Sequence, residues 1–219
     1  MRLVIVVAAL SLFVSATACV ARAQAPNPTT YVAIGASDAV GVGAADPEAE
    51  GWVARFAAHL GSNVRVVNLG VSGSTMAQAV EEQLRPALDA QPDVVTVWLA
   101  VNDLNSRVPL EQYAANLDTL LGQLEATHAR VLVGNVPDLG RLAVYRGVDA
   151  SALNAEVDRW NLAIAASTAR HGAVLVDLYS QWQEIAQHPE YLSADGFHPS
   201  SEGYQALADV FAGAERAGT

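Results

Sequence analysis

The sequence contains no lysine, one cysteine and few charged residues of any kind. All twelve basic residues are arginine, against 23 acidic residues, and the formal net charge is -11. Clustered lysine and arginine bind phosphate backbones, so this balance argues against nucleic acid as a partner. The absence of lysine also excludes a P-loop. With 52% hydrophobic and 16% charged residues, the chain is expected to fold into a globular core rather than remain disordered.

The N-terminus has the pattern of an export signal, and it contains the single cysteine. Arg2 precedes the apolar run 3–14, and Ala21-Arg22-Ala23 forms an A-x-A cleavage site. We therefore expect a signal peptide over 1–23, a spacer over 24–29, and export to the periplasm or the extracellular space without stable membrane insertion. Cys19 would be lost with the signal, which leaves no disulfide and no cysteine nucleophile. A lipoprotein anchored through Cys19 is a less favoured alternative, because the lipoprotein box lacks its usual leucine.

From residue 30 onward, short apolar runs alternate with longer amphipathic stretches. The expected strands are 31–34, 64–68, 94–100, 130–134 and 173–177, and the expected helices are 50–60, 75–88, 110–128, 151–171 and 201–214. Continuous apolar runs are typical of parallel strands that are covered on both faces. The pattern predicts one α/β domain over 30–219, a three-layer α/β/α fold with a five-stranded, mostly parallel sheet. We expect the flavodoxin-like strand order 2-1-3-4-5.

Polar residues and glycines follow the expected strands at the edge where parallel α/β sheets bind ligands. Ser37 comes after the first strand, Gly73 lies in a glycine-rich turn after the second, and Asn102 follows the third. Asp195 and His198 come after the fifth strand, at the entry to the last helix. Because these positions meet at one edge of the sheet, the five residues are expected to converge.

Each of these residues has an ordinary structural explanation when it is taken alone, as a helix cap or a turn residue. Their combination favours acyl transfer. Serine needs a base to remove its proton, and the spacing of Asp195 and His198 lets a carboxylate orient the imidazole. Gly73 and Asn102 can offer N–H donors to an oxyanion. The other four histidines fall within helical or helix-end patterns and are expected to be structural; they are His59, His128, His171 and His188.

Taken together, these motifs resemble the SGNH (GDSL-type) hydrolase superfamily, in particular its bacterial lipases and esterases. Its four blocks carry Ser, Gly, Asn and His in this order. The matching segments are Gly35-Ala-Ser37, Asn68-Leu-Gly-Val-Ser-Gly73, Val101-Asn102-Asp103 and Asp195-Gly-Phe-His198-Pro199, and the match spans about residues 30–215. The resemblance implies a flavodoxin-like fold and a serine ester hydrolase that uses no metal and no organic cofactor.

The resemblance also implies a role for each matching residue. Ser37 would attack the acyl carbon, and His198 would act as general base and then acid while Asp195 orients it. The oxyanion would be held by the backbone N–H groups of Ser37 and Gly73 and by the side chain of Asn102. Substrates would be small-molecule, lipid or carbohydrate esters. The superfamily includes lysophospholipases and thioesterases, so the natural ester stays open, as does the oligomeric state.

Two positions depart from the family pattern. The family's Gly-Asp-Ser is Gly35-Ala36-Ser37 here, with an aspartate displaced to Asp38, and its Gly-x-Asn-Asp begins with Ala100. These changes affect the expected rate and substrate shape more than the reaction class. The absence of a long apolar lid favours short acyl chains, for which Leu139, Leu142, Val144 and Tyr145 can form a modest wall.

Two interpretations from other classes remain open at this point. An α/β-hydrolase would need the nucleophile motif G-x-S-x-G. Two positions after Ser37 stands Ala39, and two positions after Ser72 stands Ser74, so neither serine completes the motif. A non-catalytic flavodoxin-like binding domain would leave the combination of Ser37, Asn102 and His198 as a coincidence. A fluorophosphonate probe separates these classes, because a binding domain would not react with it.

Overall fold

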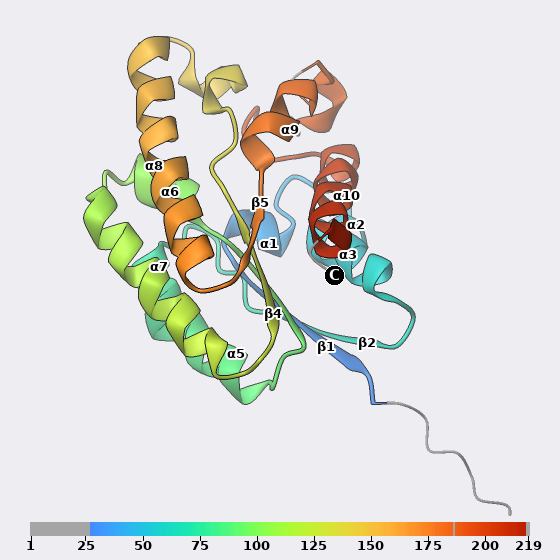
Figure 1. The fold of residues 1–219 in the computed structure, drawn as a ribbon. Helices are drawn as coiled ribbons and strands as arrows, with labels where there is room; N and C mark the ends of the chain where they lie inside the picture. Colours follow the sequence, from blue (N-terminus) through green and yellow to red (C-terminus); the bar gives the residue numbers. More distant parts are fainter. Residues whose placement is uncertain (1–26, 186, 218–219) are drawn as a thin grey trace, which may run out of the picture.

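The computed structural model describes residues 27–185 and 187–217, and its centre is a five-stranded sheet (Figure 1). The strands are β1 (Thr29–Gly35), β2 (Val64–Asn68), β3 (Val94–Trp98), β4 (Arg130–Gly134) and β5 (Val174–Val176). Neighbouring strands are parallel, and their order is β2-β1-β3-β4-β5. This result confirms the predicted fold class and strand order. The predicted signal peptide, with Cys19, lies outside the described residues.

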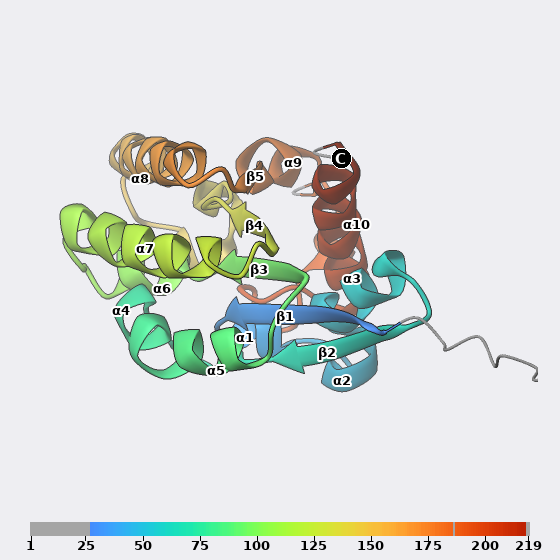
Figure 2. The same ribbon diagram turned by 60° about the horizontal axis from the view of Figure 1, so that its bottom comes forward.

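Helices cover both faces of the sheet and make the outer layers (Figure 2). One layer contains α4 (Met76–Gln78), the π-helix η1 (Ala79–Gln83), α5 (Leu84–Asp89), α7 (Leu110–Glu125) and α8 (Ala150–Arg170). The other contains α3 (Trp52–Leu60) and α10 (Ser201–Ala217). No helix in the described ranges is long and apolar enough to cross a membrane.

The two hydrophobic cores follow from the alternation of side chains along the strands. In β1, Val32 and Ile34 belong to the core beneath α5, α7 and α8, whereas Tyr31 and Ala33 face the core beneath α3 and α10. Trp52 in this second core stacks on Phe211, with ring centroids 4.5 Å apart. Because both faces of the central strands are buried, these strands read as continuous apolar runs, as expected.

The structure corrects several predicted element boundaries. The strand expected over 94–100 ends at Trp98, because α6 (Ala100–Asn105) begins there. A further helix, α9 (Leu178–Ile185), follows β5, so the Asp195–His198 turn does not come directly after that strand. Between β4 and α8, where the sequence predicts neither a strand nor a helix, the chain forms two 3-10 turns, η2 (Leu139–Arg141) and η3 (Ala143–Tyr145). Elements this short span too few residues to show a hydrophobic period.

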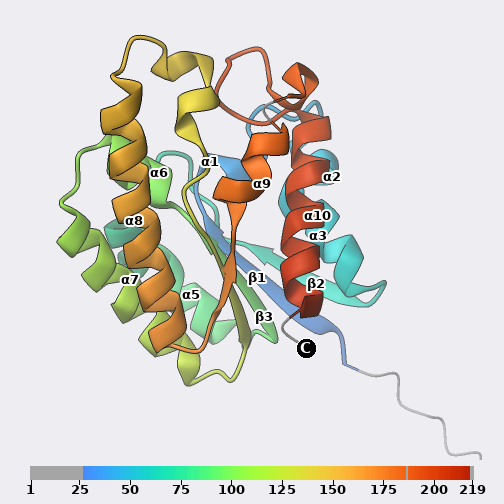
Figure 3. The same cartoon turned by 45° about the horizontal axis from the view of Figure 1, so that its top comes forward.

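The remaining short elements lie at or near the carboxyl edge of the sheet (Figure 3). They are α1 (Ser37–Val40), α2 (Pro47–Glu50) and the 3-10 turn η4 (Pro189–Tyr191). In Figure 3 the helices α1 and α9 are seen between the two outer layers, at the end where the strands point. The loops that carry the motif residues therefore meet at one edge of the molecule.

Candidate active site

Ser37, His198 and Asp195 form a continuous chain of hydrogen bonds. Ser37 is the first residue of α1 and is 8% exposed. Nδ1 of His198 lies 2.6 Å from Oδ2 of Asp195, and its Nε2 lies 2.9 Å from Oγ of Ser37. A carboxylate can only accept, so Nδ1 carries the proton and Nε2 is left to accept one from the Ser37 hydroxyl. The structure thus brings the three residues together as a hydroxyl, an imidazole and a carboxylate in hydrogen-bond contact.

The turn that carries His198 is organised by Asp195 itself. Its second oxygen, Oδ1, accepts from the backbone N–H groups of Phe197 at 2.8 Å and His198 at 2.9 Å, and from the Ser193 hydroxyl at 2.9 Å. Partial burial acts to raise the pKa of Asp195, but the hydrogen bonds from His198, Phe197 and Ser193 outweigh it and hold this pKa well below its usual range. The carboxylate therefore stays ionised and fixed in place beside the imidazole.

The loop after α1, which contains Gly43, packs against the turn that carries His198. Gly43 has a φ of +99°, and a Cβ at this position would lie 2.4 Å from the Pro199 carbonyl oxygen and 3.1 Å from the Cβ of His198. Only glycine allows so close an approach with this backbone conformation. The loop is also tied to α10, because the Tyr204 hydroxyl donates to the Val42 carbonyl at 2.6 Å. Gly43 thus allows this loop to pack closely against the turn that carries His198.

Three N–H donors lie on the loops around Ser37. Gly73 has a φ of +81° in the turn before α4. Within the described part of the chain, the backbone N–H groups of Ser37 and Gly73 donate to no protein acceptor. Nδ2 of Asn102 donates to the Ser74 carbonyl at 2.9 Å, which fixes the amide and leaves its second hydrogen free to donate. The Asn102 amide is therefore held in place, and the N–H groups of Ser37 and Gly73 keep their capacity to donate.

Asp103 in α6 contacts the start of α4, the helix that follows the Gly73 turn. It is fully buried, and its Oδ2 accepts from the Met76 backbone N–H at 2.8 Å, at the first residue of α4. Burial raises the pKa of Asp103 to about 6, while the Met76 N–H acts to lower it. Asp103 belongs to the third motif, but the sequence indicates no role for it. Its contact with Met76, together with that of Asn102 with Ser74, holds the turn that carries Gly73 against α6.

Asp38 lines a small, mostly apolar pocket next to Phe197 and Pro199, the two neighbours of His198. The other residues lining this pocket are Trp98, Val101, Pro137, Leu139, Leu142, Phe197 and Pro199. Burial raises the pKa of Asp38 to about 6; the charge of His198 acts to lower it and that of Asp195 to raise it. The displaced aspartate of the first motif is therefore close enough to interact with the base, and it also borders the space available to a substrate.

The expected acyl wall is only partly assembled. Leu139 and Leu142 are buried and line the pocket, as proposed. Val144, in contrast, is 52% exposed, and the Tyr145 hydroxyl donates to Asn105 at 2.8 Å. The 3-10 turns, which the sequence did not indicate, direct these two residues away from the pocket lining.

The other histidines lie apart from the Ser37 site. His59 is paired with Asp209 across α3 and α10, at 2.9 Å. His188 precedes η4 in a loop rather than in a helical pattern, and its Nδ1 lies 2.8 Å from Glu190. His171 follows α8 and contacts two carboxylates of α7. Ala36 and Ala100, the two residues that depart from the family pattern, are both buried, with exposures of 3% and 0%.

Comparison with known proteins gives consistent matches. Residues 33–206 match the GDSL-like lipase/acylhydrolase family. An acetylxylan esterase of Geobacillus stearothermophilus is 23% identical over 155 residues, covering 68% of this chain and 70% of that protein. A human protein, isoamyl acetate-hydrolyzing esterase 1 homolog, is 28% identical over 177 residues, covering 72% and 71%. In fold, the hydrolase LAE5 from the metagenome of Lake Arreo, Spain, aligns with a TM-score of 0.70 at 23% identity, over 88% of this chain and 97% of its own.

Proposed function

The chain belongs to the GDSL-like lipase/acylhydrolase family and is a hydrolase acting on ester bonds, and from this premise we propose that it works through an acyl-serine intermediate on Ser37. The observation that carries the proposal is the hydrogen-bonded chain from Ser37 through His198 to Asp195. Such a chain supplies what a serine hydroxyl lacks by itself, namely a base in contact with its proton.

In the proposed reaction, His198 first takes the hydroxyl proton at Nε2 as Oγ of Ser37 bonds to the acyl carbon. The carbonyl π electrons move onto oxygen, and the resulting oxyanion accepts hydrogen bonds from the N–H groups of Ser37 and Gly73 and from Asn102. The ester C–O bond then breaks, and His198 gives its proton to the leaving alcohol. Water repeats the sequence on the acyl-enzyme, which releases the acid and regenerates the serine.

Asp195 contributes through charge and orientation. Its carboxylate holds Nδ1 protonated and stabilises the imidazolium that forms in each half-reaction. The low pKa of Asp195 supports this role, because the group stays ionised throughout the working pH range of an esterase. Every step uses side chains and backbone of this chain alone.

We further propose that the favoured substrates carry short acyl chains, acetyl esters above all. The pocket beside Ser37 is small, and Asp38 interrupts its apolar lining. A long chain gains about 0.8 kcal/mol for each CH₂ only where an apolar channel receives it. Two relatives with different alcohols, an acetylxylan esterase and an isoamyl acetate-hydrolyzing esterase homolog, are both named for acetate esters. The shared element is the small acyl group.

Two measurements test the proposal. Mass spectrometry after fluorophosphonate labelling should find the adduct on Ser37, and Ser37→Ala should abolish it. The ratio kcat/KM along p-nitrophenyl esters from acetyl to palmitoyl should fall as the chain lengthens. A steady rise through the long chains would instead indicate a lipase or a lysophospholipase, and a preference for acyl thioesters would indicate a thioesterase.

Export remains a proposal that rests on the first 23 residues. Expression of the full chain in a bacterium, followed by N-terminal sequencing of the secreted or periplasmic product, should give a chain that begins at Gln24. A product that retains Cys19 with attached lipid would make the protein a lipoprotein instead.

A further inference from the structure

Gln83 is buried on the core side of the helical stretch that begins at α4. This stretch follows residues 69–75, which carry Gly73 and are called the oxyanion loop below. Gln83 is 2% exposed and is the last residue of the π-helix η1. Its Oε1 accepts from the Gly35 backbone N–H at 3.0 Å, and its Nε2 donates to the Gly35 carbonyl at 3.0 Å and to the Ser74 hydroxyl at 3.2 Å. One carboxamide thus binds both peptide groups of one residue and reaches a second loop.

The place of these contacts explains why a carboxamide is needed. Gly35 is the last residue of β1 and stands two positions before Ser37, whereas the pairing of β1 with β2 ends at Ala33 and Asn68. Beyond that pair, the segment after β2 still reaches Gly35 through the Val71 N–H, which donates to the Gly35 carbonyl at 3.2 Å, whereas the acceptor of the Gly35 N–H is Gln83. A carboxamide has the donor and the acceptor of a peptide group, so Gln83 continues the sheet pairing where β2 has turned away.

The π-helix is what makes this contact available. Its wider turn shifts the side chains of η1 relative to those of a regular α-helix, and such segments occur frequently at functional sites. Burying a carboxamide is costly unless its polar atoms are satisfied, and here three contacts satisfy them. An apolar residue would fill the same space without this cost, so packing alone does not explain a glutamine here.

From these contacts we propose that Gln83 is a positioning residue that fixes the nucleophile turn relative to the oxyanion loop. It binds Gly35 on the Ser37 side and Ser74 on the Gly73 side, and Ser74 in turn accepts from Asn102. Gln83 is therefore linked to the segments that carry all three proposed oxyanion donors, which are Ser37, Gly73 and Asn102. The inference rests on the proposed function, because it assigns Gln83 the task of holding that site together.

The expected consequence of losing Gln83 is a loss in kcat with little change in KM. Donors that stabilise the oxyanion act in the transition state more than in the bound ester. A displacement of about 1 Å in such a site costs up to about 100-fold in rate. Gln83→Met keeps the length and removes all three hydrogen bonds, so we expect kcat to fall about 10-fold to 100-fold, with a parallel fall in the rate of fluorophosphonate labelling.

A matched control removes a buried hydrogen bond from the same strand at its other end. The Tyr31 hydroxyl lies 2.9 Å from Oγ1 of Thr96, between β1 and β3. Tyr31→Phe should lower the melting temperature and leave kcat within about twofold, measured well below the melting temperature of each variant. If Gln83→Met also stays within twofold, or if Tyr31→Phe loses as much kcat, the positioning role is wrong.

A third variant gives a readout that a purely structural role would not move. In Gln83→Glu the ionised carboxylate cannot donate to Gly35, but the protonated carboxyl can both donate and accept. Its kcat relative to wild type should rise as the pH falls from about 8 to 5, whereas the ratio for Gln83→Met should stay flat; a flat ratio for both would overturn the inference.

If Gln83→Met does not fold, Ser74→Ala decides the matter. It removes the bridge between Gln83 and the oxyanion loop, together with a longer contact of 3.5 Å from the Ser74 hydroxyl to the adjacent Thr75 carbonyl. The value of kcat should fall about threefold to tenfold; an unchanged kcat overturns the proposal. Ser37→Ala separates this result from the proposed function. An active Ser37→Ala variant would refute the acyl-serine mechanism, while an inactive one with fully active Gln83 and Ser74 variants would refute only the role of Gln83.

Discussion

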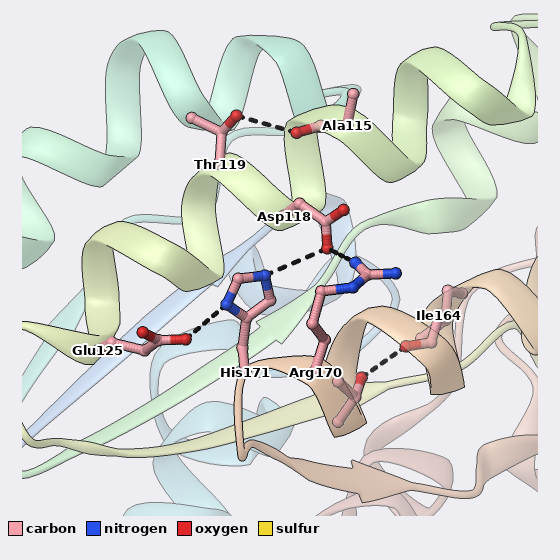
Figure 4. Close-up of polar contacts among 8 residues, drawn as sticks. Ala115, Asp118, Thr119, Glu125, Ile164, Arg170 and His171 are labelled. Atoms are coloured by element: carbon pink, nitrogen blue, oxygen red, sulfur yellow. Dashed lines mark hydrogen bonds and ion pairs between the residues drawn. The ribbon is translucent and has the colours of Figure 1, made fainter.

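Two histidines of this protein have nearly the same burial and both contact carboxylates, yet only one of the two also contacts a hydroxyl. The side chain of His198 is 16% exposed and that of His171 is 15% exposed. At His198, Nδ1 faces Asp195 and Nε2 faces the Ser37 hydroxyl. At His171, Nδ1 lies 2.5 Å from Glu125 and Nε2 lies 3.2 Å from Asp118 (Figure 4).

The difference lies in the partner of the second ring nitrogen. A hydroxyl can give up its proton, whereas a carboxylate has none to give. The Asp118 carboxylate is also paired with Arg170, and the cluster joins the end of α8 to α7 (Figure 4). A histidine beside a carboxylate is therefore a common structural element, and the hydroxyl on the far side of the ring is what makes it a candidate for catalysis.

The largest expected effect separates the two histidines directly. His198→Ala should lower kcat by about 10³-fold or more, because Ser37 loses its base, while His171→Ala should retain kcat within about twofold. Adding Ser37→Ala to His198→Ala should cost little more, since the two residues act as one unit. Ester hydrolysis by the purified variants, each with a native circular dichroism spectrum, checks this. Equal losses at both histidines would remove the distinction.

A second prediction concerns the donors that surround only the His198 site. Asn102→Ala should lower kcat by about 10²–10³-fold with KM nearly unchanged, because the amide acts on the oxyanion of the transition state. Steady-state kinetics with p-nitrophenyl acetate measure both constants. A change confined to KM would make Asn102 a residue for ground-state binding instead.

The sequence was sufficient to predict the sheet and the meeting of Ser37, His198 and Asp195. Each central strand is a continuous apolar run, and each motif residue stands where a strand or turn ends, so order and convergence followed from topology. Gln83 and Asp38 could not be assigned in the same way. The role of Gln83 depends on a π-helix that is too short to show its own hydrophobic periodicity in the sequence. The environment of Asp38 depends on loops with 3-10 turns, which are also too short to be predicted from a sequence pattern.

A third prediction tests the carboxyl that borders the His198 site. Burial raises the pKa of Asp38 to about 6, above its ordinary value of 3.8. As the pH rises between these values, the unfolded chain releases this proton first, so the folded state loses stability over this window and the loss is complete above about pH 6. Between pH 4 and pH 7, the free energy of unfolding of the wild type should therefore fall by about 1–2 kcal/mol more than that of Asp38→Asn.

Urea unfolding of both proteins at pH 4 and pH 7 measures this difference. Asp103, whose pKa is raised in the same direction, remains in both proteins, so its contribution cancels in the comparison. Asp195 acts with the opposite sign, since its lowered pKa adds stability that is lost as the pH falls. An equal pH dependence in wild type and Asp38→Asn would contradict the buried carboxyl.

The smallest expected effect is on stability at the second histidine. His171→Ala should lower the free energy of unfolding by about 0.5–1 kcal/mol, because its partners Glu125 and Asp118 are largely exposed to solvent, with side-chain exposures of 53% and 36%. The loss should shrink in 1 M salt, where exposed charges are screened. A loss of several kcal/mol that is insensitive to salt would point to packing rather than to the ion pairs.

The contact between Ser37 and His198 joins residues 161 positions apart, and all five strands come before the histidine in the chain. During synthesis the serine is made early, and it is chemically an ordinary alcohol until the turn at 193–200 docks against the loop at Gly43. In the proposed mechanism Ser37 gains its base only when this turn has packed, so a chain that stops before residue 193 should lack hydrolytic activity even though it contains all five strands.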